Sequence, residues 1–370
     1  MKQAILLNPG PVVLSDRVRR SLQQPDLCHR EPEFFDLQDC IRQRLLDVYA
    51  LDDADWVAVL LSGSGTSAME AMVSSLVPAD GELLVIENGV YGERLSEIAR
   101  VYGITHTAVA HRWDQAIDLD RVEQVLQQST AFTHLAVAHH ETTTGRLNDV
   151  TALAQLCQRH KVKLLIDGVS SFGAESIDFD QWPIAAVAAT ANKCLHGIPG
   201  LSFVISLRQQ LNQCQPRTLY LDLNRYAKAQ AKRGTPFTPA FPAFYALDAA
   251  LQELADQGGW QQRQARYGQL AERVRQCLHS VGIEGMLPAE QSSVVLRSYY
   301  LPPGMSYKLW HDYLRDQGFI IYAGQGHFSS EMFRVSTMGQ ITDQDIDRLC
   351  RAMRAGILEG LNSSASGDAA

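Results

Sequence analysis

Two residues of this chain, Lys193 and Asp167, have the types and settings that a carbonyl cofactor requires. Lys193 lies in ATANKCLHGIPG, between an apolar run and a segment of glycine and proline, and a solvated surface lysine seldom has such flanks. Asp167 ends the apolar run VKLLID, which in a parallel sheet places it at the carboxyl edge, where ligands bind. A lysine amine condenses with an aldehyde, and a buried carboxylate keeps a pyridine nitrogen protonated. Each residue alone also fits a surface lysine or a helix-capping aspartate, but together they predict a pyridoxal phosphate site with Lys193 and Asp167 as catalytic residues.

A glycine and serine turn supplies a candidate phosphate site. In WVAVLLSGSGTSAMEAMVSSLV an apolar run leads into a helical pattern, so Ser64, Gly65 and Thr66 are expected on a strand-to-helix turn. Backbone amides at a helix N-terminus, with hydroxyls nearby, bind phosphate groups. Such a turn alone is more often a plain connection, and this one matches neither the Rossmann nor the P-loop pattern. Its place ahead of the aspartate and the lysine favours phosphate binding.

Apolar runs alternate with amphipathic stretches along the chain, which is typical of an α/β fold. The strand candidates are residues 58–63, 82–87, 105–110, 134–140, 163–167, 185–190 and 201–206. Because these runs are apolar throughout, we expect a largely parallel sheet covered on both faces. Three prolines between residues 236 and 242 precede a long helical pattern, and we interpret them as the hinge into a smaller domain. The predicted organisation is an N-terminal arm (1–15), a large cofactor-binding α/β domain (16–255), a small C-terminal α+β domain (256–361) and a disordered tail (362–370).

Composition narrows the class of protein. The chain has 370 residues, 46% of them hydrophobic, and a net charge of −8 without a basic cluster, which argues against nucleic acid as a partner. No apolar run reaches the length of a membrane span, and MKQAILLNPGP lacks the form of a secretory signal. The seven cysteines are odd in number and without framework spacing, so we expect reduced thiols and a cytoplasmic protein. No metal site emerges from the sequence.

Short motifs spread over nearly the whole chain resemble one known family. They are LLNPGPV (6–12), LLSGSGTSAMEA (60–71), ENGVYGER (87–94), HHETTTGRLND (139–149), LLIDGVSSFGA (164–174), ATANKCLHGIPGLSFVI (189–205), FIIYAGQG and MFRVSTMG. They resemble the class V aminotransferases of fold type I. The resemblance implies a large domain with a mostly parallel seven-stranded sheet, a smaller α+β C-terminal domain, and a homodimer with shared active sites. Within the family the motifs are most similar to those of the 2-aminoethylphosphonate:pyruvate aminotransferases.

The resemblance also implies roles for single residues. The aromatic ring of Tyr91 stacks on the cofactor, Thr142 binds its 3-oxygen, and Val169 packs on its ring. Asn192 and Thr238 hold the cofactor phosphate, with Thr238 supplied by the neighbouring subunit. Arg334 clamps the acid group of the substrate, since a guanidinium matches carboxylate and phosphonate oxygens in pairs, and Arg30 is a weaker candidate for a second such group. The purely structural alternatives are that Tyr91 is a core aromatic residue, that Thr142 is an ordinary turn residue, and that the two arginines form ion pairs.

The activity implied is a ping-pong transfer of the amino group of 2-aminoethylphosphonate to pyruvate, giving phosphonoacetaldehyde and L-alanine. A second reading is an alanine:glyoxylate or serine:pyruvate aminotransferase, because CHREPEFFDL (28–37) resembles a segment of that branch. A desulfurase or lyase is less favoured, because residues 322–338 hold no cysteine for the mobile nucleophile it needs, and Cys194 is interpreted as a packing residue. A non-enzymatic cofactor-binding protein would need an added interaction module, and the sequence shows none.

Overall fold

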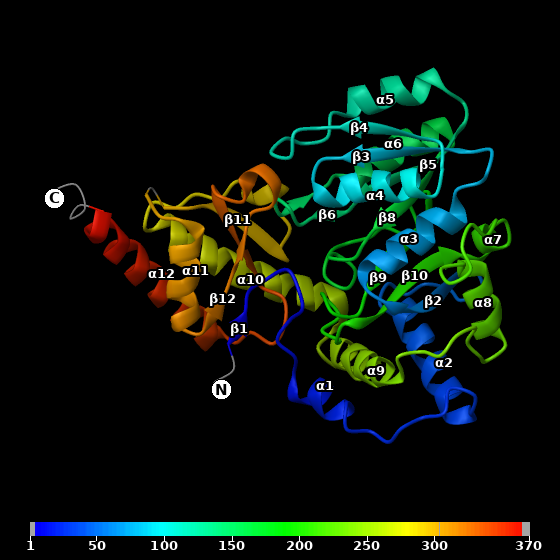
Figure 1. Cartoon of the computed structure of the whole chain (residues 1–370), viewed down its shortest axis with the longest axis horizontal. Helices are drawn as coiled ribbons and strands as arrows, with labels where there is room; N and C mark the ends of the chain where they lie inside the picture. Colours follow the sequence, from blue (N-terminus) through cyan, green and yellow to red (C-terminus); the bar gives the residue numbers. More distant parts are fainter. Residues whose placement is uncertain (1–3, 303, 365–370) are drawn as a thin grey trace.

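Seven apolar segments pair into one sheet, and they coincide with the strand candidates of the sequence. The computed structural model describes residues 4–302 and 304–364. Across the sheet the strands lie in the order β2 (Trp56–Gly63), β10 (Gly200–Leu207), β9 (Ile184–Thr190), β8 (Lys163–Asp167), β5 (Phe132–Ala138), β3 (Glu82–Glu87) and β4 (His106–Ala110). β10 runs antiparallel to both of its neighbours, and the other pairings are parallel. The predicted mostly parallel, seven-stranded sheet is therefore confirmed (Figure 1).

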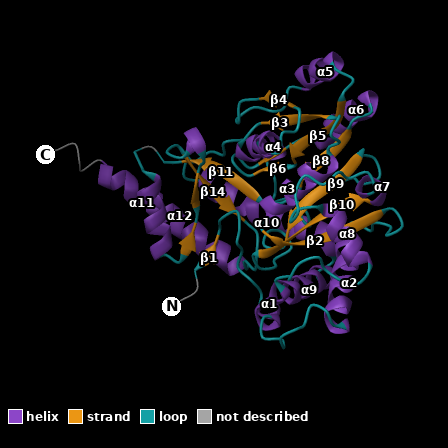
Figure 2. Cartoon of the chain, turned by 45° about the vertical axis from the view of Figure 1, so that its right-hand side comes forward, coloured by secondary structure: helices purple, strands orange, loops and turns teal. Residues whose placement is uncertain are grey.

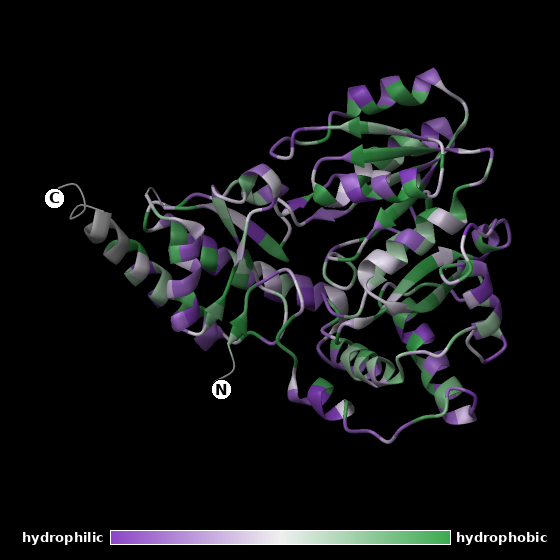
Figure 3. Cartoon of the chain, in the orientation of Figure 1, coloured by the Kyte–Doolittle hydropathy of each residue, from purple (hydrophilic) through white to green (hydrophobic). Residues whose placement is uncertain are grey.

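Helices cover both faces of this sheet, as uniformly apolar strands require. Alternate residues of β2 enter two separate cores, because successive side chains of a strand point to opposite faces. One face is covered by α2 (Pro32–Asp47), α5 (Leu119–Gln128), α6 (Val150–His160) and α9 (Phe241–Asp256), and the other by α3 (Gly65–Leu76), α4 (Val90–Val101), α7 (Arg208–Leu211) and α8 (Leu223–Ala231). Figure 2 shows the strands between these helices, and Figure 3 shows hydrophobic residues along the strands and hydrophilic residues on the outer helices.

The C-terminal part of the chain forms a smaller lobe. It consists of α10 (Gly259–His279), α11 (Tyr307–Asp316) and α12 (Asp343–Ser364) with an antiparallel sheet of β11 (Leu296–Tyr300), β14 (Met332–Ser336) and β13 (Tyr322–Ala323). The expected N-terminal arm joins this lobe, because β1 (Ile5–Leu6) pairs in parallel with β12 (Phe319–Ile320). Leu7 is fully buried in the core of the lobe. Residues from both ends of the chain therefore stabilise the same unit.

The structure corrects two expectations about the junctions. The prolines at residues 236–242 are not the hinge, because the helix they introduce, α9, packs on α2 and on α1 (Asp16–Ser21) of the large lobe. The chain instead leaves the large lobe at Gly258 and Gly259, which have φ values of +92° and +81° that favour glycine. α12 continues to residue 364, so a disordered tail beginning at residue 362 is wrong for its first three positions. Residues 365–370 lie outside the described part, and the domain boundaries themselves stay a prediction.

Within residues 4–302 and 304–364, no helix combines the length and the hydrophobicity that crossing a bilayer requires.

Candidate active site

Lys193 lies in the loop that follows the fully buried strand β9, and its side chain is partly buried. Its Nζ donates a hydrogen bond to the carbonyl oxygen of Pro9. Gly10, with φ at +108°, packs so closely that a Cβ there would lie 2.8 Å from the lysine Cδ. Burial lowers the pKa of Lys193 to about 8, against the opposing influence of Cys194 and Asp167. A substantial fraction of this amine is therefore neutral near pH 8, as nucleophilic attack on a carbonyl requires.

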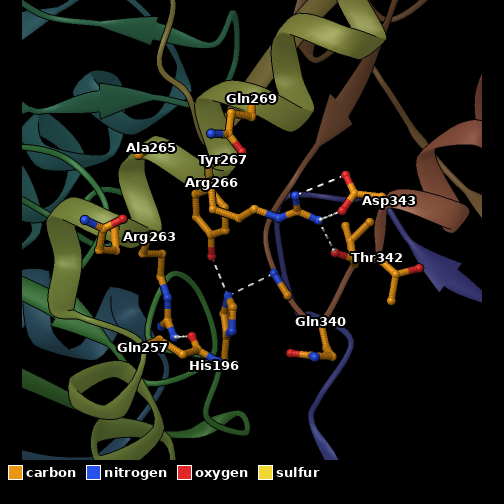
Figure 4. A pocket seen from close by; sticks show the side chains of 13 residues that line it. His196, Gln257, Arg263, Ala265, Arg266, Tyr267, Gln269, Gln340, Thr342 and Asp343 are labelled. Carbon is orange, nitrogen blue, oxygen red and sulfur yellow. Dashed lines mark hydrogen bonds and ion pairs between the residues drawn. The ribbon is translucent and has the colours of Figure 1, made fainter.

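The back of the lysine loop is fixed by α10 and by the turn after β14 (Figure 4). His196 accepts a hydrogen bond from the Gly339 amide at 2.9 Å and pairs with the Tyr267 hydroxyl. Arg263 donates from Nη1 to the carbonyl oxygen of Cys194 at 2.7 Å. These contacts line a cavity of about 540 Å³ that neither Lys193 nor Asp167 borders. Cys194 is buried and packs, as expected, and burial raises the pKa of its thiol to about 12.

Asp167 ends β8 at the carboxyl edge of the sheet, where the sequence placed it. Its Oδ1 accepts a hydrogen bond from the Val169 amide at 2.9 Å, and the residue is 5% exposed. Burial raises its pKa to about 7, and the nearby carboxylate of Glu141 adds to the effect. In the described ranges, no cationic side chain forms an ion pair with Asp167. A protonated ring nitrogen would supply the missing positive charge.

The glycine and serine turn forms at the start of α3, next to Asp167. Ser64 is the N-cap of α3, but its exposed side chain makes no capping hydrogen bond and stays available to a ligand. A Cβ on Gly65 would lie 2.7 Å from Cγ1 of Val169, so only glycine lets the turn approach that residue. The hydroxyl of Thr66 accepts a hydrogen bond from Arg94 Nη1 at 3.4 Å. Amides and hydroxyls at this helix N-terminus fit a phosphate group.

Tyr91 lies in the first turn of α4, and two residues that the sequence reasoning missed hold it. The guanidinium of Arg94 stacks over the Tyr91 ring, with 4.7 Å between its carbon and the ring centroid. Glu141 Oε2 accepts hydrogen bonds from the amides of Tyr91 at 3.1 Å and Gly92 at 3.3 Å. Burial raises the pKa of Glu141. Both missed residues stand inside the motifs ENGVYGER and HHETTTG, which were the signal that could have identified them.

His140, in the short strand β6 (His140–Glu141), and Thr142, in the turn that follows this strand, both have buried polar side chains. The carboxyl group of Glu141, which lies between them in the sequence, points to α4. Thr142 Oγ1 and His140 Nε2 are both buried without a hydrogen-bond partner among the described residues. Burial lowers the pKa of His140 to about 3. Buried polar groups normally have partners, so these two atoms fit a bound polar molecule.

Arg334 reaches the site from β14 of the small lobe and is 3% exposed. Its Nε donates to the carbonyl oxygen of Ala323 at 2.8 Å. Its Nη1 donates to the carbonyl oxygen of Thr142 at 2.8 Å and to Gln325 Oε1 at 3.1 Å. Nη2 has no hydrogen-bond partner in the part of the chain that the structure describes. The free donors of Nη2 suit an acid oxygen of a substrate.

Three further candidates lie differently. Asn192 Oδ1 accepts a hydrogen bond from Thr190 Oγ1 at 2.8 Å, and the Cβ of Thr190 would lie 3.4 Å from a Cβ on Gly65, so Asn192 is near the phosphate turn. Thr238 is exposed, two residues before Ala240, whose amide donates to Ser62 Oγ at 2.9 Å. Arg30 is exposed in a turn ahead of α2, and among the described residues it makes neither a hydrogen bond nor an ion pair. The alternative ion pair is therefore not seen for Arg30 within the described residues, and its acid-binding role stays a prediction.

The residues brought together fit the cofactor that the sequence predicts. They offer an amine with a lowered pKa, a buried carboxyl group without a cation, a helix N-terminus with hydroxyl groups, and an aromatic side chain nearby. Pyridoxal phosphate carries the matching aldehyde, ring nitrogen, phosphate and ring face.

Family membership follows from comparison with known proteins. The model of the aminotransferase class V family matches residues 27–349. The chain therefore belongs to the class V aminotransferases, a family that uses pyridoxal phosphate.

Several relatives have a stated substrate pair. The chain is 34% identical to the 2-aminoethylphosphonate–pyruvate transaminase of Vibrio cholerae over 96% of its own length and 99% of that protein. It is 33% identical to the enzyme of the same description from Klebsiella pneumoniae, over 94% of this chain and 96% of that one.

Solved structures agree with the fold. The aspartate aminotransferase of Thermus thermophilus superposes with a TM-score of 0.88 at 27% identity, covering 96% of this chain and 99% of that one. The alanine–glyoxylate aminotransferase of a Nostoc species gives a TM-score of 0.89 at 25% identity and covers 96% of each chain. The fold-type I architecture expected from the sequence is thus confirmed.

Proposed function

We propose that this aminotransferase uses pyridoxal phosphate to move the amino group of 2-aminoethylphosphonate to pyruvate, giving phosphonoacetaldehyde and L-alanine. The observation that carries the choice of substrates is the 34% identity, over nearly the whole chain, to transaminases of that description. The geometry of the site supports the reaction class independently.

The bound cofactor would supply an electron sink for the amine-bearing carbon of the substrate. Lys193, with its lowered pKa, is the group that takes a proton from that carbon and returns one in each half of the cycle. Asp167 holds the ring nitrogen protonated, and the turn at Ser64, Gly65 and Thr66 binds the phosphate. These roles rest on the chemistry of the side chains and on their positions around the lysine loop.

Substrate binding is assigned to Arg334. 2-Aminoethylphosphonate and pyruvate each carry one acid group, and the free Nη2 of Arg334 offers one buried cationic donor for it. Because Nε and Nη1 already donate to Ala323, Thr142 and Gln325, the acid binds through Nη2 unless Gln325 moves. Arg30 is not needed in this arrangement. The proposed working unit is a homodimer in the cytoplasm in which Thr238 completes the phosphate site of the partner subunit.

An alanine:glyoxylate aminotransferase is the second candidate, favoured by the segment 28–37 and by the likeness to the Nostoc enzyme. Alanine and glyoxylate also carry one acid group each, so the acid-binding group does not distinguish the two reactions.

A half-reaction distinguishes them. Purified protein loaded with pyridoxal phosphate is mixed with 2-aminoethylphosphonate, and the cofactor spectrum is followed with no acceptor present. Conversion to the pyridoxamine form, reversed by pyruvate, is the expected result. No change with the aminophosphonate but full conversion with alanine, reversed by glyoxylate, would overturn the choice of substrates and favour the second candidate.

A further inference from the structure

We propose that Trp113 is a positioning residue for Arg334 and sets the affinity of the enzyme for the acid group of its substrates. The inference rests on the proposed function, because it takes Arg334 as the acid-binding group. Trp113 lies in the loop 111–118 of the large lobe, between β4 and α5. It acts through residues 323–328 of the small lobe, which we call the strap.

The strap supplies two of the three acceptors that orient Arg334. The carbonyl oxygen of Ala323 accepts from Nε at 2.8 Å, and Gln325 Oε1 accepts from Nη1 at 3.1 Å. Gln325 Oε1 also accepts from the hydroxyl of Thr143 at 3.5 Å. The direction in which Nη2 points therefore depends on where the strap lies.

Trp113 packs directly on the strap. Its ring centroid is 4.7 Å from that of His327 and 6.3 Å from that of Phe328. Gly326 has a φ of +54°, and a Cβ there would lie 2.6 Å from Cη2 of the indole. The strap therefore meets the indole through a backbone position that only glycine fits, next to a cluster of aromatic rings.

Trp113 is itself held in place by Arg146. The carbonyl oxygen of the next residue, Asp114, accepts a hydrogen bond from Arg146 Nη2 at 3.0 Å. Arg146 is 3% exposed, and its Nη1 donates to Gln291 Oε1 at 2.8 Å. The Gly145 amide just before it donates to the carbonyl oxygen of Glu141 at 2.9 Å.

These contacts form a continuous chain of residues that begins and ends at the guanidinium of Arg334. The turn at residues 141–145 supplies the Thr142 carbonyl to Arg334 and leads through Arg146 to the loop of Trp113. Trp113 packs on His327 of the strap, and Gln325 of the strap accepts a hydrogen bond from Arg334. Loss of the indole leaves the strap without its aromatic contact to the large lobe, so Nη2 is no longer aimed at one point. Lys193 and Asp167 take no part in these contacts, so the proton transfers should be unaffected.

The test is a double-mutant cycle across the contact, with Trp113→Leu, Gly326→Ala and the pair, measured as kcat and KM for both substrates. Each single variant should raise both KM values about tenfold, because a misaligned charge-assisted hydrogen bond costs about that much affinity. We expect kcat and the absorbance of the bound cofactor to change less than twofold. The KM values of the double variant should be little higher than those of Trp113→Leu, because the alanine Cβ then meets no indole, whereas the backbone strain at a φ of +54° persists and lowers thermal stability. Trp113→Phe should restore most of the affinity.

A second readout does not depend on turnover. The dissociation constant of methylphosphonate, an acid with neither amine nor carbonyl, is measured by calorimetry on the cofactor-loaded protein, and we expect it to rise about tenfold in Trp113→Leu. The matched control is Trp260→Leu, another partly exposed tryptophan, which stacks on Tyr49 in a different part of the molecule. The control should leave KM and methylphosphonate binding unchanged.

Unchanged KM values and methylphosphonate binding in both single variants would overturn the inference. So would equal losses in kcat and cofactor absorbance, since these indicate general damage, or additive effects in the double variant. Failure of the proposed function is distinguishable, because wild-type protein would then not transaminate 2-aminoethylphosphonate at all.

Discussion

Lys193 and Asp167 have pKa values shifted in opposite directions by the same cause. Burial disfavours charge, so it lowers the pKa of the lysine to about 8 and raises that of the aspartic acid to about 7. Near neutral pH the cofactor-free protein therefore holds an amine that loses its proton easily and a carboxyl group that keeps one. Both states favour binding of an aldehyde with a basic ring nitrogen.

The lysine shift predicts the pH dependence of cofactor uptake. Only the neutral amine attacks the aldehyde, so the rate of uptake should rise from pH 6 and level off above about pH 8, where Lys193 is mostly deprotonated. Stopped-flow absorbance after mixing cofactor-free protein with pyridoxal phosphate measures this rate. A midpoint above pH 10, as for an ordinary lysine, would contradict the account.

The aspartate shift predicts a pH-dependent stability of the cofactor-free protein. The folded chain holds the Asp167 proton up to about pH 7, whereas the unfolded chain loses it near pH 4. Unfolding between these pH values therefore releases a proton, so the free energy of unfolding falls as pH rises through this window. Replacement of Asp167 by Asn should flatten that fall, by an amount on the order of a few kcal/mol. Urea unfolding of both proteins at pH 5 and pH 7 measures it, and identical slopes would refute the assignment of the shift.

Side-chain type and flanks were enough to single out Lys193 and Asp167 as candidates, because a lysine next to an apolar run is unusual in itself. Their catalytic roles stay a prediction. Arg94 and Glu141 were missed because their roles depend on packing between α4 and β6, which are far apart in sequence. Arg30 was proposed from a motif likeness, the structure places it in an exposed turn, and its role stays a prediction.

Among the elements, α4 depends most directly on a side chain from elsewhere in the chain. Its N-cap is Gly89, which has no side chain to cap the helix. Glu141 accepts instead from the amides of Tyr91 and Gly92, and also from Thr143. One carboxyl group therefore joins the aromatic side chain expected on the cofactor to the turn that contacts Arg334.

Replacement of Glu141 by Ala should lower stability and cofactor affinity together. The change leaves buried amides without an acceptor, which costs about 1–3 kcal/mol, and it releases Tyr91. The matched control is Asp149→Ala, which removes the cap of α6 at a cost of about 1 kcal/mol but touches no site residue. Thermal unfolding and cofactor titration measure the two effects. Equal cofactor affinity in the two variants would argue against a role for Glu141 in the site.

The strands were predicted well because runs such as IAAVAAT, which are apolar throughout, fit a strand that is buried on both faces of a sheet. The hinge was predicted poorly. Prolines mark where a helix can begin, and α9 does begin there, but which lobe a helix packs on depends on its apolar face. The chain instead passes from the large lobe to the small lobe at Gly258 and Gly259, after α9.

Across the whole molecule, the proposed homodimer assigns a role to Thr238, whose side chain is exposed in a single chain. Two residues after Thr238, the amide of Ala240 donates a hydrogen bond to Ser62 Oγ, just ahead of the phosphate turn. We expect a homodimer by light scattering, with Thr238→Ala raising the dissociation constant of the cofactor severalfold and Thr238→Ser restoring it, because one hydrogen bond to a phosphate is lost. A fully active monomer would contradict this expectation.

A smaller C-terminal lobe was expected from the change of pattern that begins at residues 236–242, although the hinge lies elsewhere, but the place of the N-terminus was not expected. Pairing of β1 with β12 joins segments from opposite ends of the chain, and no local pattern encodes such a contact. The same arrangement brings Pro9 and Gly10 against Lys193.

The account depends most on Lys193 as the residue that holds the cofactor. Borohydride reduction of the pyridoxal phosphate-loaded protein, followed by proteolysis and mass spectrometry, tests this directly. We predict one pyridoxyl-phosphate modification, on the peptide that carries Lys193, and none after Lys193→Ala. Label on another lysine, or no label at all in protein saturated with the cofactor, would contradict the account.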